Sequence, residues 1–127
     1  MKFIVAGSRH IKEVIAYGEL VKLRISKDHP FSRGKVTEIV SGCANGPDSA
    51  GEVYGKFYDI PIKKFPAEWD KYGKRAGPIR NNKMAAYADA LLLIWDGKSS
   101  GSRHMKQAML ELHKPVYEII LETDETD

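Results

Sequence analysis

Short apolar runs that end at glycine or serine recur along this chain, and each is followed by a stretch with helical spacing. A run of this kind predicts a buried strand that ends in a tight loop, and apolar residues three and four positions apart predict one face of a helix. The two patterns alternate five times. This alternation, more than any other feature, constrains the fold: it predicts a three-layer α/β domain with a mainly parallel five-stranded sheet and helices on both faces.

The expected strands cover residues 3–6, 36–41, 60–65, 90–95 and 115–121, and the last but one is the most apolar stretch in the chain. Residues 66–77 are expected to form a loop, after which a helix begins at Gly77-Pro78. Spacing also predicts which helix residues face the core. These are Ile11, Val14, Ile15, Gly18, Val21 and Ile25 in the first helix, Ala50, Val53, Tyr54 and Phe57 in the second, and Met105, Ala108, Met109 and Leu112 in the last.

The length of 127 residues suits a single domain, which we assign to residues 1–121, followed by an acidic tail at 122–127 that is expected to be solvated and disordered. No apolar run approaches 18 residues, so no membrane span is predicted. The first ten residues lack the hydrophobic region of a signal peptide, which favours a cytoplasmic location. A single cysteine, Cys43, permits no internal disulfide and no cysteine-rich zinc site.

Residues 1–117, which we call the body of the chain, are more basic than the net charge of the whole chain suggests. Residues 118–127 hold five acids and no base, so the first 117 residues carry a net charge of +8 against +3 for the whole chain. A basic body favours partners that bear phosphate. Because the bases are scattered and form no Lys/Arg run, a small anionic ligand is favoured over DNA or RNA.

Three loops are candidates for binding this anion, because parallel strands end at one edge of the sheet and ligands of such folds bind there. Glycine lets backbone N–H groups approach a ligand, and a helix N-terminus adds partial positive charge. Turn geometry alone also explains glycine and serine in any single loop. The candidate residues are Gly7, Ser8 and Arg9 in the first loop, Ser41, Gly42, Gly46 and Asp48 in the second, and Gly97, Lys98, Ser99, Ser100, Gly101 and Ser102 in the third.

The helix between the last two of these loops adds Arg80 and Asn81 as candidates, and Arg103 also lies near the edge. No G-x-G-x-x-G and no P-loop motif is present, so standard dinucleotide and P-loop NTPase sites lack their main support. If the protein is an enzyme, the candidate catalytic residues are Arg80, Asp96 and His104. Asp96 is equally explained as a turn former, and His104 as a polar residue early in a helix. No cofactor and no metal is predicted.

Aromatic and basic residues alternate between residues 69 and 75. Trp69 and Tyr72 are candidates for stacking on a base while Lys74 and Arg75 meet phosphate, although aromatic residues also anchor long loops to a core. Cys43 is expected to narrow the space above the second strand.

Four blocks of sequence carry a family resemblance: VAGSR (5–9), VSGCANGPD (40–48), FPAEWDKYGKRAGPIRNNKM (65–84) and ADALLLIWDGKSSGSRHM (88–105). Together they resemble the small Rossmann-like SLOG proteins related to YspA and YpsA, over residues 3 to about 120. The resemblance implies a Rossmann-like fold and a nucleotide or nucleotide-derived ligand, held by the loops after the first and fourth strands. Relatives commonly dimerise through helices beside the site, so it also implies a homodimer, for which the Met105, Met109 and Leu112 face is a candidate.

A more distant similarity is to the Lonely-guy branch of the same superfamily, which hydrolyses the N-glycosidic bond of nucleoside 5′-monophosphates. Arg80 to Met84 and Gly97 to Met105 occupy the places of its motifs, but His104 and Met105 stand where that branch has two acidic residues. The carboxylates that its hydrolysis needs are therefore absent.

Three hypotheses follow. The first is a nucleotide-binding sensor or accessory protein; the second is a nucleotide-processing hydrolase or ribosyl transferase. The third is a nucleic-acid accessory domain, because the DNA-processing protein DprA also contains a SLOG-like domain.

Overall fold

The computed structural model describes residues 1–122 and contains one five-stranded sheet in which all pairs are parallel. The order of strands is β3-β2-β1-β4-β5. This confirms the predicted α/β, Rossmann-like fold with its parallel sheet. The strands are β1 (Lys2–Gly7), β2 (Glu38–Ser41), β3 (Ile62–Lys64), β4 (Ala90–Trp95) and β5 (Val116–Ile120). The expected tail lies, apart from Glu122, outside the described residues.

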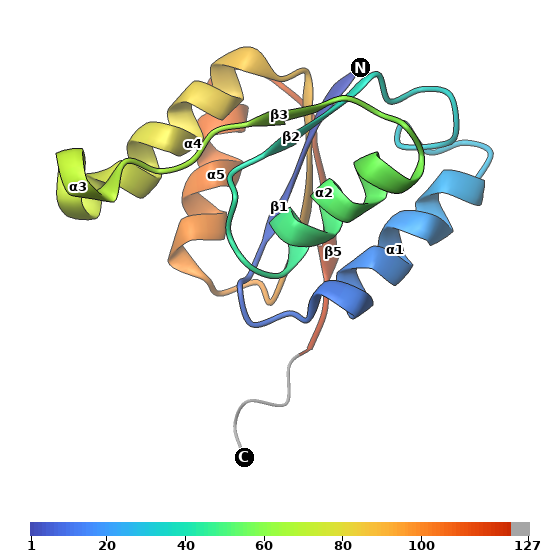
Figure 1. Cartoon of the computed structure of the whole chain (residues 1–127), viewed down its shortest axis with the longest axis horizontal. Helices are drawn as coiled ribbons and strands as arrows, with labels where there is room; N and C mark the ends of the chain where they lie inside the picture. The colour runs from blue at the N-terminus through green and yellow to red at the C-terminus, as the bar shows by residue number, and fades with distance from the viewer. Residues whose placement is uncertain (123–127) are drawn as a thin grey trace.

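Helices cover both faces of the sheet (Figure 1). Helices α1 (Glu13–Ile25) and α2 (Pro47–Phe57) pack side by side on one face, and α4 (Ala76–Tyr87) and α5 (Ser100–Glu111) on the other. Side chains alternate along β1 accordingly, because successive strand residues point to opposite faces. Phe3 and Val5 join the core under α1 and α2, whereas Ile4 and Ala6 join the core under α4 and α5.

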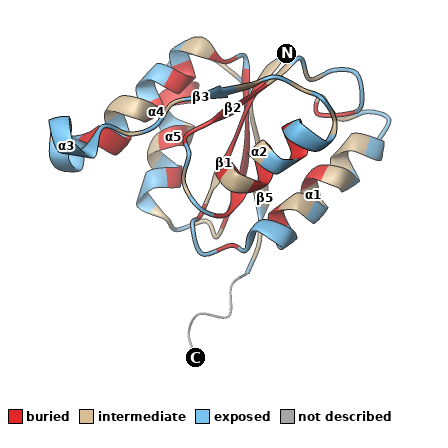
Figure 2. Cartoon of the chain, viewed as in Figure 1, coloured by how far each residue is buried: buried red, intermediate tan, exposed pale blue. Residues whose placement is uncertain are grey.

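The central strands are the most buried part of the molecule (Figure 2). All six residues of β4 are buried, as expected for a strand with neighbours on both sides and helices on both faces. Its observed bounds match the predicted ones. Residues 66–77 differ from the prediction, because they contain the short helix α3 (Trp69–Tyr72) and a 3-10 turn (Gly73–Arg75) rather than an irregular loop.

The predicted core face of α2 is half wrong. Ala50 and Tyr54 are fully buried, but Phe57 is 71% exposed and Val53 is also exposed. The cause lies in the glycines: a Cβ at Gly51 would stand 2.8 Å from the Val5 Cβ, and one at Gly55 would stand 2.8 Å from the Ile62 Cγ1. The helix therefore approaches the sheet through its glycines, and this rotates the larger apolar side chains toward solvent.

Helix α1 also turns a different face inward. Ala16 and Leu20 are buried, whereas Val14 is 73% exposed and Ile15, Gly18 and Ile25 are exposed as well. Of the predicted set, Ile11 is buried just before the helix and Val21 is half-buried. The sequence is apolar on several sides of this helix, so the periodicity alone does not select one face.

In α5 the prediction holds except at its end. Met105, Ala108 and Met109 are buried, whereas Leu112 is exposed and lies one residue beyond the helix. The two methionines therefore belong to the core and are not available to a partner subunit. The homodimer stays a prediction.

The strand order places a switch point between β1 and β4, because the chain leaves β1 for β2 on one side and later returns through α4 to β4 on the other. At such a point neighbouring loops diverge and leave a crevice at the carboxyl ends of the strands. Separately, none of the helices within residues 1–122 is both long and apolar enough to span a membrane.

Candidate functional site

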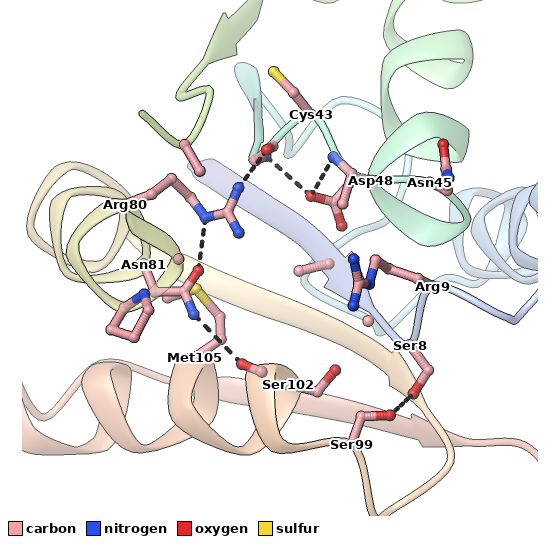
Figure 3. A pocket seen from close by; sticks show the side chains of 18 of the residues that line it. Ser8, Arg9, Cys43, Asn45, Asp48, Arg80, Asn81, Ser99, Ser102 and Met105 are labelled. Atoms are coloured by element: carbon pink, nitrogen blue, oxygen red, sulfur yellow. Dashed lines mark hydrogen bonds between the residues drawn. The ribbon is translucent and has the colours of Figure 1, made fainter. Parts of the chain in front are cut away.

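A cavity of about 870 Å³ opens at the carboxyl edge of the sheet, and we call it the strand-end cleft. It is bounded by the loops that follow β1, β2, β3 and β4 and by the first turns of α4 and α5 (Figure 3). The structure brings thirteen of the predicted residues together here. They are Gly7, Ser8, Arg9, Gly42, Asp48, Trp69, Lys74, Arg80, Asn81, Ser99, Ser100, Gly101 and Ser102.

The loops after β1 and β4 are joined through Ser8. Its hydroxyl group accepts a hydrogen bond from the Asp96 N–H at 3.1 Å and lies 2.6 Å from the Ser99 hydroxyl oxygen. Gly7 makes this approach possible, because a Cβ there would stand 1.7 Å from the Ile94 carbonyl oxygen. The two loops are therefore joined by hydrogen bonds into one wall of the strand-end cleft.

Asp96 organises the β4–α5 loop from within. Its Oδ1 accepts hydrogen bonds from the N–H groups of Lys98 and Ser99, both at 2.8 Å, and from the Ser99 hydroxyl at 2.9 Å. The other oxygen lies 3.2 Å from the Nε2 of His10. Partial burial alone would raise the pKa of Asp96, but these hydrogen bonds outweigh it and hold the pKa below its usual range. Asp96 is therefore an ionised carboxylate that fixes the loop.

The start of α5 presents unused donors to the strand-end cleft. The first helical hydrogen bond runs from the Arg103 N–H to the Ser99 carbonyl, so the N–H groups of Ser100, Gly101 and Ser102 precede it, and none of the three donates to a group within residues 1–122. The Ser102 hydroxyl oxygen is buried and has no hydrogen-bond partner among the described residues. Four donors thus gather at the positive end of a helix dipole.

Arg80 and Asn81 connect α4 to both neighbouring loops. One guanidinium nitrogen of Arg80, Nη1, donates to the Gly42 carbonyl, and its Nε donates to the Asn81 Oδ1 at 2.9 Å. The Asn81 amide nitrogen donates to the Gly101 carbonyl at 3.4 Å and lies 3.2 Å from the His104 Nδ1. This network orients the Arg80 guanidinium on the wall opposite Ser8 (Figure 3).

Asp48 is a nearly buried carboxyl group in the first turn of α2, with 4% of its surface exposed. Its Oδ2 accepts hydrogen bonds from the N–H groups of Gly42 at 3.1 Å and Ala44 at 3.4 Å. Burial raises the pKa of Asp48 to about 6, although the Ala44 N–H, the Arg80 guanidinium and the Gly42 N–H pull it down. This carboxyl group therefore changes its charge close to neutral pH.

Several predicted residues lie outside the lining of the strand-end cleft. The Ser41 hydroxyl donates to Glu52 at 2.6 Å, and Gly46 serves the turn before α2 with a φ of 78°. Arg103 donates to the Gly97 carbonyl at 3.4 Å. Tyr72 lines an adjoining basic groove of about 300 Å³ with Lys63, Lys64 and Lys83, and this groove shares Pro66 and Arg80 with the strand-end cleft. The remaining residues outside the lining are Arg75, Asp96, Gly97, Lys98 and His104.

Pattern reasoning missed part of the lining. Pro66 and Ala67 follow β3, and Asn45 belongs to the β2–α2 loop. Pro66 and Ala67 could have been predicted from the sequence, because they follow a strand that ends at the same edge of the sheet as its neighbours. Cys43 lies at the cleft with an exposed residue surface, and desolvation raises the pKa of its thiol. No group of three or more metal-ligating side chains gathers within residues 1–122.

Comparison with known proteins finds a similarity to a phage protein. The chain is 32% identical over 77 residues to the "Gene 61 protein" of Mycobacterium phage D29, and the match covers 55% of this chain and 62% of the phage protein. The chain thus spans less than two thirds of that relative. No family model matches the chain. No solved structure matches it either. The SLOG resemblance stays a prediction that rests on the sequence blocks quoted above.

Proposed function

We propose that the protein binds a nucleotide or a related phosphorylated small molecule in the strand-end cleft, as a sensor or accessory protein. The observation that carries this proposal is the start of α5, where three N–H groups and the Ser102 hydroxyl, all without partners in residues 1–122, share one wall of the cleft. Buried polar groups without partners are rare in folded proteins, and a phosphate group has enough acceptor oxygens to satisfy several donors at once.

Charge in the strand-end cleft supports an anionic ligand. The Arg80 guanidinium keeps donors beyond those used by Gly42 and Asn81, and Arg9 lines the same cavity. Arginine forms strong, geometrically specific hydrogen bonds with phosphate. The dipole of α5 adds positive potential at its first turn.

One aromatic residue of the cleft lining, Trp69, can stack on the base of a nucleotide. Trp69 lines the strand-end cleft and is 56% exposed, so its ring surface is open to a ligand. A base stacked on an exposed indole gains on the order of 1–3 kcal/mol. This contact would favour a nucleotide over a simple phosphate ester.

Cleavage of an N-glycosidic bond is the second candidate function, and Asp48 is the observation that favours it. A carboxyl group with a pKa of about 6 can donate or accept a proton near neutral pH. The predicted catalytic residues Asp96 and His104 do not line the strand-end cleft, and only Arg80 of that set does. Binding without turnover is therefore the better supported function.

Binding is tested by a thermal-shift screen of the protein against nucleoside monophosphates, other nucleotides and ADP-ribose-type compounds. A stabilising compound is then titrated, and each complex is checked by chromatography for free base. Intact ligand supports a binding protein, and released base supports the enzyme. Steep salt dependence of binding to DNA would instead favour the nucleic-acid accessory role.

Two pairs of variants locate the ligand. Arg80→Ala is expected to weaken binding about tenfold or more, whereas Arg103→Ala, outside the cleft lining, leaves it unchanged. Gly101→Asp places a negative charge beside the free N–H groups and is expected to abolish binding, whereas Gly101→Asn is a neutral control of the same size. The Gly101 Cβ direction is open space, so neither side chain clashes. Parental affinity in both Arg80→Ala and Gly101→Asp would overturn the proposed site.

A further inference from the structure

One group in the strand-end cleft does not suit an anion: the carboxyl group of Asp48. It is 4% exposed, lines the cavity and lies near Arg80. When ionised, it repels a phosphate group held in the same cleft. A site that held only phosphate would bind it better without this carboxyl group. We therefore looked for a second role of Asp48, in contact with another part of the ligand.

Only one oxygen of the Asp48 carboxyl group is hydrogen-bonded to the β2–α2 loop. Oδ2 accepts the hydrogen bonds from Gly42 and Ala44, whereas Oδ1 receives none from residues 1–122. In Figure 3 the carboxyl group faces the open centre of the cleft, with Arg80 on one side and Arg9 on the other. Oδ1 is not one of the buried atoms that lack a partner, so water reaches it from the cleft. A ligand that displaces this water has to provide a donor in its place.

We propose that Asp48 is a specificity-determining residue that selects phosphorylated ligands with neighbouring hydroxyl groups, of the ribose 5-phosphate class, by accepting a hydroxyl hydrogen bond at Oδ1. This inference rests on the proposed function, because it takes the phosphate to lie at the start of α5. A hydroxyl group is a donor without charge, so it gains from the carboxylate, whereas a second phosphate at this point is repelled.

The charge of Asp48 depends on the groups around it. Burial favours the neutral acid, and so does the charge of Glu52, while the Arg80 guanidinium and two N–H groups favour the carboxylate. The other titratable groups of the cleft lining are those of Arg9, His10, Cys43 and Lys74. Selection for hydroxyl groups is therefore strongest above about pH 6, where Asp48 is ionised, and weakens in acid.

The test compares two probes that share a phosphate group and differ in hydroxyl groups: ribose 5-phosphate and methyl phosphate. Affinities of both are measured by calorimetry for the wild-type protein, Asp48→Asn and the control Asp70→Asn, whose side chain is outside the cleft lining. Asparagine keeps an oxygen that can accept from Gly42 and Ala44, and thermal unfolding of each variant checks the fold.

The two probes are expected to respond with opposite signs. Asp48→Asn lowers the affinity for ribose 5-phosphate about tenfold or more, because a charge-assisted hydrogen bond is replaced by a weaker neutral one. The same substitution leaves the affinity for methyl phosphate unchanged or raises it, because a like charge is removed. Asp70→Asn leaves the preference as in the wild type.

The ratio of the two affinities also provides a pH test. In the wild type the preference for ribose 5-phosphate falls when the pH is lowered from about 8 to about 5, whereas in Asp48→Asn it stays constant. Both probes carry a phosphate that titrates near pH 6, so this titration largely cancels in the ratio.

The outcomes separate the inference from the proposed function. An equal preference in the wild type and Asp48→Asn at every pH overturns the role of Asp48 and leaves the phosphate site intact. If neither probe binds the wild-type protein and the nucleotide screen also gives no stabilising compound, the phosphate site itself is wrong.

Discussion

Asp48 and Asp96 occupy similar places in the fold, yet their surroundings push their pKa values in opposite directions. Each lies between a strand end and the body of a helix, and each accepts hydrogen bonds from two backbone N–H groups. The pKa of Asp96 falls, whereas that of Asp48 rises to about 6. Asp96 has a hydroxyl donor and a histidine in addition, while Asp48 is more deeply desolvated and lies near Glu52.

The difference shows that backbone donors alone do not decide the role of a carboxylate. Where the donors outweigh burial, as at Asp96, the charge is locked in place and holds a loop. Where burial dominates, as at Asp48, ionisation costs free energy, and one carboxylate oxygen has no donor within residues 1–122. The first arrangement is structural, and the second is suited to a ligand.

The largest expected effect is from removal of the structural carboxylate. Asp96→Ala eliminates three hydrogen bonds to Oδ1 and is expected to lower the free energy of unfolding by about 3 kcal/mol. Asp96→Asn retains an acceptor oxygen and is expected to lose less. Urea denaturation near neutral pH measures both, and a loss of less than about 1 kcal/mol in Asp96→Ala would remove the distinction between the two carboxylates.

A smaller effect of opposite sign is expected at the other carboxylate. Because the folded pKa of Asp48 is raised above its usual 3.8 to about 6, its stabilising protonation is complete below about pH 4 and is lost as the pH rises through 6. Asp48→Asn is therefore expected to be up to about 3 kcal/mol more stable than the wild type at pH 7.5. The difference should vanish near pH 4. Urea denaturation across this range measures it, and a difference independent of pH would contradict the shift.

The smallest effect concerns the glycine between Arg80 and Asp48. A Cβ at Gly42 would stand 2.8 Å from the Arg80 Nη1 and 2.9 Å from the Asp48 Oδ2, so Gly42→Ala is expected to cost about 1 kcal/mol while both side chains shift. Gly101→Ala is the control, because its Cβ meets open space in a helix, and it is expected to be neutral or slightly stabilising. Equal stability of the two variants in thermal unfolding would show that Arg80 and Asp48 are not closely packed on Gly42.

The sequence predicts the sheet well, because a short apolar or β-branched run such as residues 90–95 seldom forms anything other than a buried strand in a chain of this size. The faces of α1 and α2 were not predictable from spacing. Helix α1 is apolar on several sides, and in α2 the close contact of Gly55 with Ile62 matters more than the hydrophobicity of Phe57. Hydrophobic periodicity is calculated from side chains, so it does not detect a helix face that packs closely because its glycines have no side chain.

The site was predictable at the level of loops and not at the level of individual side chains. Parallel topology brings the strand ends together, which places Ser8, Arg80 and Ser102 at one cleft. Which way a polar side chain turns depends on its nearest partner. The Ser41 hydroxyl turns to Glu52, and His104 lies against Asn81, and neither contact leaves a signal in the spacing of the sequence.

The glycines of α2 also set the depth of the cleft from a distance. Gly51 and Gly55 allow the helix to lie close against Val5 and Ile62, and the same helix carries Asp48 at its other end. Any side chain at these two positions would push the helix away from the sheet as a unit, and Asp48 would retreat with it. The reach of the carboxyl group into the cleft thus depends on two positions that lie outside the cleft lining.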